Sequence, residues 1–273
     1  MHLAIDHQTV YRYSEPTSHS IQYLRLTPLS GAGQAVRSWS VDAPSRMSQW
    51  RDAYDNIVHV LTIDRPHSEV RVRVFGVVDT EDLNGVFPAE NQPVAEAVFL
   101  RETALTEPDD AIRGVAEPLR SLAERDRLNA LHRMMNAIRD AMDYRIGETD
   151  ARTTAPAALA AESGVCQDHA HVFISCARTL GIPARYVSGY LFAGDQDEAY
   201  TAGHAWAEAL VPGLGWVGFD VANRVCPGEA YVRAAVGRDY LDAAPVRGAR
   251  RGGGDEDLDV QVRVGQAQHQ AQA

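Results

Sequence analysis

The stretch Gly164-Val165-Cys166-Gln167-Asp168-His169 places a cysteine where one short helix ends and a longer one begins. Glycine is a frequent helix stop, and the mostly apolar residues up to Leu180 predict a buried helix that starts at Cys166. The N–H groups in the first turn of a helix have no intrahelical acceptor, and with the helix dipole they stabilise a negative charge. Cys166 is therefore a candidate thiolate nucleophile, and its own N–H is the best candidate oxyanion donor.

Two downstream segments carry the partners that a thiol nucleophile needs. His204 begins a predicted strand over 204–211, and Asp220 lies in a second strand over 216–221, with a Pro-Gly-Leu-Gly turn between them. Facing side chains on antiparallel strands approach to about 5 Å, which allows an imidazole–carboxylate hydrogen bond. Each residue alone has an ordinary structural interpretation. Their joint occurrence predicts a Cys-His-Asp hydrolase or acyltransferase.

A metal site is the main alternative at this position, because Cys166, His169 and His171 offer thiolate and imidazole ligands. On a helix, His169 lies about 60° and His171 about 140° around the axis from Cys166, so one face cannot present all three. The sequence contains neither CxxC nor HExxH. We expect no metal and no cofactor.

The composition limits the class of protein. Of 273 residues, 45% are hydrophobic and 23% charged, as in a water-soluble globular protein. The net charge of −11 argues against a nucleic-acid partner, and no apolar run approaches the ~18 residues of a membrane span. The N-terminus lacks the basic and apolar regions of a secretory signal. Cys166, Cys176 and Cys226 are an odd number without a close pair, so we expect no disulfide and a cytoplasmic location.

The first eighty residues alternate between apolar and polar side chains over short segments separated by Pro, Asn and Asp. This pattern is typical of antiparallel strands, and it predicts a sandwich-like N-terminal β-domain over 1–80. The segment Ser14-Glu15-Pro16 is expected to end the first strand. The predicted strands are 3–13, 21–29, 36–41, 46–54, 57–63 and 70–78.

The rest of the chain divides into a connecting segment, a core and a tail. Residues 81–125 contain several prolines and predict a connection with short helices. Residues 126–265 form the expected catalytic core, which begins with an amphipathic helix over 126–144 and ends with an alternating strand over 260–264. The Gln- and Ala-rich residues 266–273 predict a disordered tail.

Several ordered motifs resemble those of the bacterial transglutaminase-like superfamily and its N-terminal β-domain, and together they cover nearly the whole chain. The core motifs are Gly164-Val165-Cys166-Gln167-Asp168, residues 181–190, His204-Ala205-Trp206 and Trp216-Val217-Gly218-Phe219-Asp220. The N-terminal motifs are His7-x-Thr9-x-Tyr11-x-Tyr13, Leu24-Arg25-Leu26-Thr27-Pro28 and Asp52-x-Tyr54-x-Asn56.

This resemblance implies an α+β, papain-like core in which the helix bearing the cysteine packs on an antiparallel sheet bearing the histidine and the aspartate. It also implies Cys166 as nucleophile, His204 as general base and acid, and Asp220 as the group that orients the imidazole. Two positions depart from the family pattern. Asp220 is followed by Val-Ala-Asn instead of a proline and threonine before the asparagine, and Asp55 stands where glycine is common.

Three further residues are candidates near the site. Gln167 follows the nucleophile and is a candidate for binding the substrate or the oxyanion, while Trp206 and Tyr186 are candidates for an acyl pocket or, equally, for the core. The resemblance favours a thiol hydrolase of amide or peptide bonds, working through a thioester on a peptide or protein substrate. Because the choice of acceptor depends on pocket geometry, transglutaminase-type transfer to an amine stays open. An inactive scaffold whose β-domain binds a partner is a third alternative.

Overall fold

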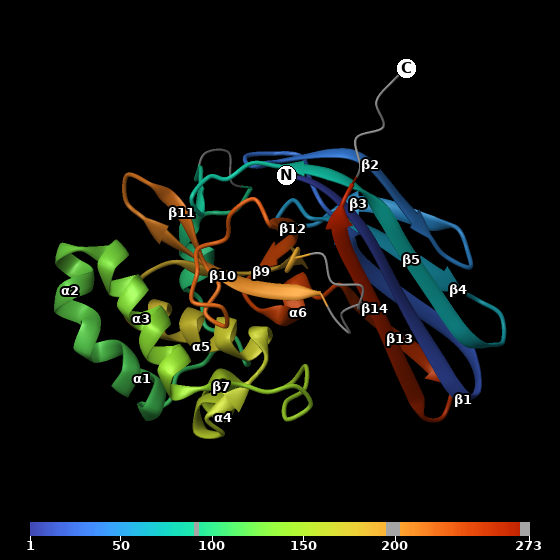
Figure 1. Ribbon diagram of the computed structural model, residues 1–273. Helices are drawn as coiled ribbons and strands as arrows, with labels where there is room; N and C mark the ends of the chain where they lie inside the picture. Colours follow the sequence, from blue (N-terminus) through green and yellow to red (C-terminus); the bar gives the residue numbers. More distant parts are fainter. Residues whose placement is uncertain (90–92, 195–202, 268–273) are drawn as a thin grey trace, which may run out of the picture.

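The N-terminal half of the chain is built around one long strand at the centre of a seven-stranded antiparallel sheet. The computed structural model (Figure 1) describes residues 1–89, 93–194 and 203–267. Buried and more exposed side chains alternate along this strand, as the period of two of a pleated strand requires. The strands of this first sheet are β1 (His2–Thr27), β2 (Gln34–Asp42), β3 (Met47–Arg51), β4 (Ile57–Ile63), β5 (His67–Thr80), β13 (Val246–Gly252) and β14 (Glu256–Gln266).

β1 continues through Ser14-Glu15-Pro16, where we predicted that the first strand ends. That prediction is wrong because the segment forms a bend within the strand. The register of β1 against β5 shifts between Arg12 and Thr17, and residues 14–16 are exposed. Proline is tolerated at such a point, since its missing N–H removes no ladder hydrogen bond.

The bend folds the first sheet over on itself. Before it β1 pairs with β5 and β14, and after it with β4 and β13, while β2 and β3 extend the outer edges. Side chains from both parts form one hydrophobic cluster, whose buried members include Tyr13, Leu24, Leu61, Val70 and Val72. This arrangement confirms the antiparallel, sandwich-like N-terminal region that the strand spacing predicted.

The last two strands of the chain also belong to the first sheet. We placed residues 126–265 in the core, but β13 and β14 pair with β1, for example Val262 with His7. The reason is that an edge as long as that of β1 must be paired or covered along its length. Of the predicted tail 266–273, residues 268–273 lie outside the described residues.

The second sheet lies between the first sheet and the helices (Figure 1) and has the order β12-β9-β10-β11-β6. Its strands are β6 (Val86–Phe87), β9 (Ala184–Leu191), β10 (His204–Val211), β11 (Gly215–Phe219) and β12 (Tyr231–Gly237). β10 and β11 form the predicted hairpin. A short parallel pair, β7 (Asp143–Tyr144) and β8 (Ser163–Gly164), precedes the central helix.

Most helices cover the face of the second sheet that is remote from the first sheet (Figure 1), whereas η1 packs on the opposite face, where Phe99 contacts Leu210 and Trp216. The helices are η1 (Glu96–Leu100), α1 (Asp110–Ala116), η2 (Glu117–Leu119), α2 (Arg120–Arg125), α3 (Arg127–Ala141), α4 (Ala155–Ala160), α5 (Cys166–Thr179) and α6 (Tyr240–Ala243). The first four are the short helices predicted between 81 and 125. No helix of the described residues is long and apolar enough to span a membrane.

α5 is buried almost all round, as its composition predicted. Its apolar side chains share one hydrophobic cluster with Ala205, Ala207 and Ala209 of β10, whose small size allows the helix to approach the sheet closely. The surrounding helices α1, α3 and α4 complete this cluster. The expected α+β core, with the cysteine-bearing helix packed on an antiparallel sheet, is therefore confirmed.

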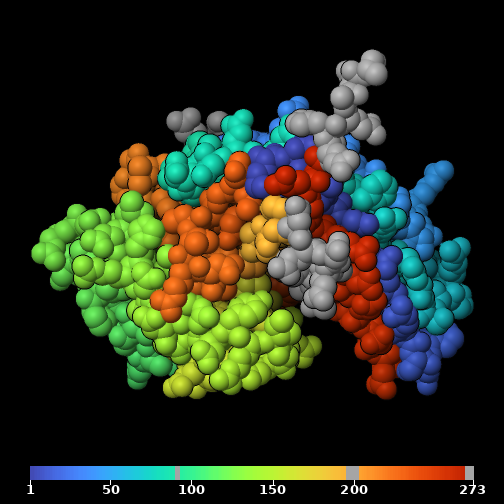
Figure 2. All heavy atoms as spheres, in the orientation of Figure 1, coloured from blue at the N-terminus to red at the C-terminus, as the bar shows by residue number. Residues whose placement is uncertain are grey.

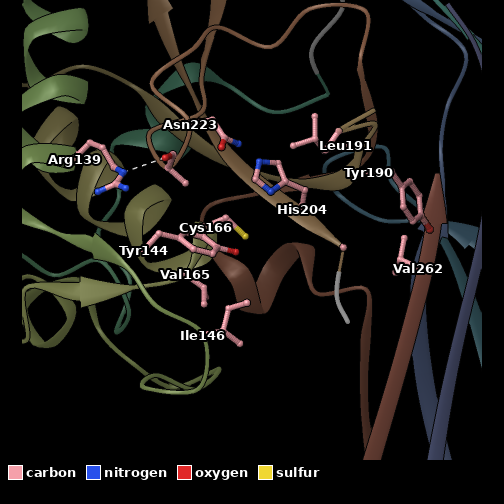
Figure 3. A pocket seen from close by; sticks show the side chains of 13 residues that line it. Arg139, Tyr144, Ile146, Val165, Cys166, Tyr190, Leu191, His204, Asn223 and Val262 are labelled. Carbon is pink, nitrogen blue, oxygen red and sulfur yellow. Dashed lines mark hydrogen bonds between the residues drawn. The ribbon is translucent and has the colours of Figure 1, made fainter. Parts of the chain in front are cut away.

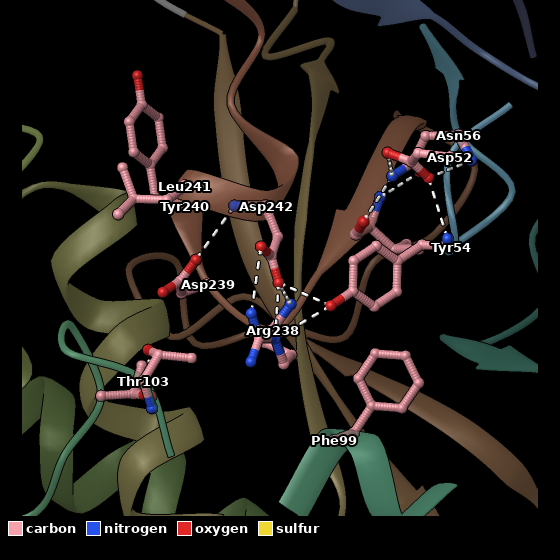
Figure 4. A network of polar contacts seen from close by, with 12 residues as sticks. Asp52, Tyr54, Asn56, Phe99, Thr103, Arg238, Asp239, Tyr240, Leu241 and Asp242 are labelled. Atoms are coloured by element: carbon pink, nitrogen blue, oxygen red, sulfur yellow. Dashed lines mark hydrogen bonds and ion pairs between the residues drawn. The ribbon is translucent and has the colours of Figure 1, made fainter. Parts of the chain in front are cut away.

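A polar network joins the turn between β3 and β4 to the second sheet (Figure 4). The Asn56 amide donates to the carbonyl oxygen of Val236 at 2.7 Å and accepts the N–H of Val236 at 2.8 Å. The Tyr54 hydroxyl donates to Asp242 Oδ2 at 2.7 Å. Asp52 Oδ1 accepts the N–H groups of Tyr54 and Asn56 at 3.0 and 3.1 Å. The Asp52-x-Tyr54-x-Asn56 motif thus attaches the N-terminal region to the core.

The structure also explains the departure at Asp55 within this motif. Asp55 has φ of +68°, in the left-handed region that favours glycine. Aspartate enters this region more readily than most residues. The turn therefore keeps its shape with aspartate in place of the common glycine.

Candidate active site

The nucleophile candidate Cys166 is the first residue of α5, where its position is set by the groups around it. The Asp168 carboxylate accepts the N–H of Val165 at 2.8 Å and the Thr149 hydroxyl at 2.7 Å, which fixes the start of the helix. A Cβ on Gly164 would lie 2.6 Å from the Cβ of Asp168, so only glycine fits before this turn. The sequence around Cys166 is therefore dictated by a tight strand-to-helix junction.

His204 joins Cys166 to the carboxylate of Asp220. Its Nε2 lies 2.6 Å from Asp220 Oδ2, so Nδ1 is the ring nitrogen left for the sulfur. Figure 3 shows the Cys166 sulfur pointing towards the imidazole. Burial lowers the pKa of His204, but hydrogen bonds to Asp220 and Cys166, with their charges, raise that pKa to about 10. The structure thus brings all three predicted residues together, and the imidazolium form of His204 is favoured between Cys166 and Asp220.

The Asp220 carboxylate is fully buried and held by several donors. Besides His204, its Oδ2 accepts the Asn223 side-chain amide at 2.7 Å and the Tyr231 hydroxyl at 2.8 Å, and its Oδ1 accepts the Asn223 N–H at 3.2 Å. Burial raises the pKa of Asp220, but the hydrogen bond and charge of His204 and the other donors hold it below its usual value. Asp220 therefore stays ionised beside the imidazole.

Asn223 and Tyr231 are the residues around Asp220 that the sequence did not identify as part of the site. Asn223 follows Asp220 by three residues, so an Asp-x-x-Asn turn was a usable signal. The bridge between Asp220 and Val225 closes this turn even though Val-Ala replaces the family's proline and threonine. Tyr231 begins β12, and only the tertiary structure places it against Asp220.

A cavity of about 480 Å³ opens beside Cys166 and His204 (Figure 3). Both sheets and the loop after β7 contribute to its walls. Most of the lining that the described residues form is apolar, and its polar side chains are those of Cys166, His204, Arg139, Asn223, Tyr144 and Tyr190. The residues of the lining are Arg139, Tyr144, Ile146, Val165, Cys166, Tyr190, Leu191, Ala193, Gly203, His204, Ala222, Asn223 and Val262.

The space-filling view shows how this region is assembled (Figure 2). The orange segments that follow residue 204 sit between the green helices and the blue and red strands of the first sheet. Val262, in the red strand β14, is the first sheet's contribution to the cavity lining. The N-terminal region and its partner strands therefore lie next to the candidate site.

The three remaining sequence candidates lie around the site and outside the cavity lining that the described residues form. Trp206 is buried and stacks on the His204 ring, with centroids 6.2 Å apart. Tyr186 is buried, and its ring centroid lies 5.2 Å from that of His171. The Gln167 amide donates to the Asp150 carbonyl oxygen at 3.4 Å. For the two aromatic residues, these positions favour the core interpretation over the acyl-pocket one.

The two histidines considered as metal ligands make structural contacts. His169 Nδ1 lies 2.9 Å from the Val165 carbonyl oxygen, and Nε2 lies 3.3 Å from that of Met142. His171 Nε2 accepts the Tyr240 N–H at 3.0 Å, and burial lowers the pKa of His171 to about 3. Across residues 1–89, 93–194 and 203–267, no group of three His, Cys, Asp or Glu side chains is arranged to hold a metal ion.

Comparisons with known proteins agree with this architecture. Residues 3–79 match the family model of the bacterial transglutaminase-like N-terminal region, and residues 113–221 match that of the transglutaminase-like superfamily. All three candidate residues fall within the second match.

Two mycobacterial proteins, both described as uncharacterized, are similar along most of their length. One from Mycobacterium leprae is 32% identical over 96% of this chain and 98% of its own. One from Mycobacterium tuberculosis is 30% identical over 89% of this chain and 86% of its own. The crystal structure of a "Putative Cysteine Protease" from Cytophaga hutchinsonii superposes with a TM-score of 0.75 over 100% of this chain and 92% of that one, at 21% identity. At that identity the likeness shows the fold.

Proposed function

The chain belongs to the transglutaminase-like superfamily and, from that premise, we propose that it is a thiol-dependent hydrolase of amide or peptide bonds. The observation that carries this proposal is a chain of hydrogen bonds in which His204 joins the Cys166 sulfur to the buried Asp220 carboxylate. Cys166 and His204 border the cavity. A peptide or protein is the proposed substrate because the cavity is apolar and bordered by residues of both sheets.

The first half of the proposed reaction forms a thioester. The Cys166 thiolate attacks the carbonyl carbon, and the oxyanion that develops lies beside the N–H groups at the start of α5. The His204 imidazolium then gives its Nδ1 proton to the leaving nitrogen as the carbon–nitrogen bond breaks. Asp220, held on Nε2, keeps the ring in place and stabilises its charge.

The second half of the reaction hydrolyses the thioester and regenerates the free Cys166 thiolate. Neutral His204 takes a proton from water as the water oxygen attacks the thioester carbon. The carbon–sulfur bond breaks, the acid leaves, and the thiolate–imidazolium pair is restored. If an amine replaced water at this step, the same groups would catalyse acyl transfer.

The first test measures the alkylation rate of each cysteine against pH by mass spectrometry, in the wild type and in His204→Ala. We expect iodoacetamide to label Cys166 faster than Cys226 at neutral pH, because burial raises the pKa of the Cys226 thiol while an imidazolium faces Cys166. The advantage of Cys166 should disappear in His204→Ala. Equal rates at the two cysteines in the wild type would favour the inactive scaffold.

A second test separates hydrolysis from acyl transfer. Peptide products are analysed by mass spectrometry with and without an added primary amine, and Cys166→Ala serves as the blank. We expect free acid products whose yield does not depend on the amine. Amine incorporation in excess of hydrolysis would replace the hydrolase proposal with a transglutaminase-type one.

A further inference from the structure

The cavity beside Cys166 has an uneven distribution of charge. Among the described residues that line it there is no aspartate or glutamate, whereas Arg139 adds a positive charge apart from the Cys166–His204 pair. Figure 3 shows Arg139 at the end of the cavity away from His204, with Tyr144 between them. The net charge of the chain is −11, so an anion is repelled at long range and needs a local cation to be held here.

The Arg139 guanidinium is fixed in place by neutral groups. Its Nε donates to the Ala222 carbonyl oxygen at 3.1 Å, and its Nη1 donates to the Met142 carbonyl oxygen at 2.8 Å. These acceptors orient the group without neutralising it. A guanidinium has five N–H donors, so donors remain beyond the two that these bonds use.

The nearby carboxylates of the described chain have other partners. Asp140, the next residue on α3, pairs with Arg224 at 2.5 Å, and Asp143 pairs with Arg145 at 3.0 Å. Within the described ranges, no carboxylate lies in ion-pair distance of Arg139. A partly buried cation in a largely apolar cavity binds an anion more strongly than one in open water, because the local dielectric constant is lower.

We propose that Arg139 binds a carboxylate of the acyl donor, so that the enzyme selects acidic peptides. This inference rests on the proposed hydrolase function and names its substrate class. The guanidinium fork matches the geometry of a carboxylate and can form two parallel hydrogen bonds with it. The apolar walls formed by Tyr144, Ile146 and Val262 then contact the rest of the substrate.

The carboxylate has two chemical sources in a peptide, an acidic side chain and the chain end. Three chloroacetyl probes separate them. Chloroacetyl-isoglutamine carries a side-chain carboxylate, chloroacetyl-glutamine carries a chain-end carboxylate, and chloroacetyl-glutamine amide carries neither. In each case Sγ of Cys166 attacks the chloromethyl carbon, the sulfur–carbon bond forms, and chloride leaves with the electrons of the carbon–chlorine bond.

The labelling rates of Cys166 and Cys226 are measured by mass spectrometry for the full chain. For each cysteine, the labelling rate with an acidic probe is divided by the rate with the neutral probe. We expect this ratio to be about tenfold higher at Cys166 than at Cys226 for one of the two acidic probes, as one charge-assisted hydrogen-bonded pair predicts. A preference for the isoglutamine probe assigns an acidic side chain, and a preference for the glutamine probe assigns the chain end. Equal ratios at the two cysteines for both acidic probes would overturn the proposal.

Variants on α3 test the role of Arg139 itself. In Arg139→Gln the acidic-to-neutral rate ratio at Cys166 should fall to the ratio measured at Cys226. In Arg139→Lys a part of the excess at Cys166 should remain. Arg133→Gln removes the same charge from an exposed position on the same helix, where Arg133 bonds to Asn129, and should keep the full preference. A preference that survives Arg139→Gln, or one that Arg133→Gln abolishes, contradicts a specific role for Arg139.

The design keeps the two proposals apart. A neutral probe that labels Cys166 no faster than Cys226 contradicts the hydrolase function, whatever the acidic probes do. A fast neutral reaction without an acidic preference contradicts only the carboxylate subsite. Both of these comparisons use the wild type, so they hold even if Arg139→Gln fails to fold.

Discussion

Strand β10 carries two ionic groups four residues apart, the partly buried His204 and the fully buried Glu208, and their surroundings differ in one respect. Glu208 is fully buried between Arg185, at 2.6 Å, and Arg233, at 3.0 Å. Arg185 in turn lies over the Trp216 ring, 4.1 Å from its centroid. The single carboxylate of this cluster is thus paired with two guanidinium groups inside the protein. The His204 group, which consists of Cys166, His204 and Asp220, instead ends at a thiol that borders a cavity.

The comparison shows that burial and a shifted pKa do not by themselves mark a catalytic site. Burial raises the pKa of Glu208, but the charges of Arg185 and Arg233 lower it below its usual value. The pKa of Glu208 is therefore shifted from its usual value, as that of His204 is. What distinguishes the candidate site is a thiol at a helix N-terminus beside a cavity that has space for a substrate.

The largest effect is expected from Cys166→Ser. If the His204 group is catalytic, this change lowers the hydrolysis rate by about 10³-fold or more, because the weaker hydroxyl nucleophile replaces the thiolate. The free energy of unfolding should change by less than about 1 kcal/mol, since the volume is nearly kept. Peptide products and urea unfolding are measured in parallel, with Cys226→Ser as the control. Full activity in Cys166→Ser would remove the distinction drawn between the two groups.

The next effect is expected from Glu208→Gln, which should act on stability. Removing the carboxylate charge takes away the anion that Arg185 and Arg233 share, and breaking a buried ion pair in this way costs about 3–5 kcal/mol. Urea unfolding gives the loss directly. Glu162→Gln, at an exposed carboxylate, is the matched control. A loss below about 1 kcal/mol would mean that the cluster is not a stabilising element.

A smaller effect is expected in the pH dependence of stability. The pKa of His204 in the folded protein is about 10, above the value near 6.5 of an unperturbed histidine. Its charged form therefore contributes stability in full below about pH 6.5, and this contribution is lost as the pH rises through about 10. Unfolding of the wild type and of His204→Gln is compared from pH 6 to pH 11. A difference that is already lost near pH 7 would contradict the charged state.

Tyr231→Phe sharpens this measurement. The change removes one of the donors on Asp220 and raises the pKa of that carboxyl, which makes its oxygen a stronger acceptor for the imidazolium. We expect the pH at which the stability contribution of His204 is lost to move higher by less than about one unit. A shift in the other direction would contradict the role given to Tyr231.

The smallest effect is expected from Arg224→Gln, which breaks an exposed pair near the cavity. The Arg224 and Asp140 side chains are 42% and 67% exposed, so solvent screens their interaction. Such pairs contribute about 0–1 kcal/mol. Urea unfolding should therefore hardly change, in contrast to Glu208→Gln. A loss as large as that of Glu208→Gln would show that exposure does not separate the two cases.

Much of the site could be predicted because its determinants are local. A glycine before Cys166, an apolar helix after it and a short turn between His204 and Asp220 are all visible within a few residues. Helix start, helix period and hairpin length depend on neighbouring residues, so the positions of the helix and both strands followed from the chain alone. The bend in β1 escaped prediction because proline there signals a strand end as well as a bend.

The sequence by itself determined most of the elements and the three candidate residues, because periodicity, turns and helix caps are properties of contiguous segments. Only the tertiary structure decided that β13 and β14 pair with β1, that Tyr231 reaches Asp220, and that Arg139 and Val262 line one cavity. The physical reason is that these contacts join segments far apart in the chain. They form because long strand edges, buried charges and apolar faces must each be paired with another part of the molecule. The residues next to them in the sequence do not show which part that is.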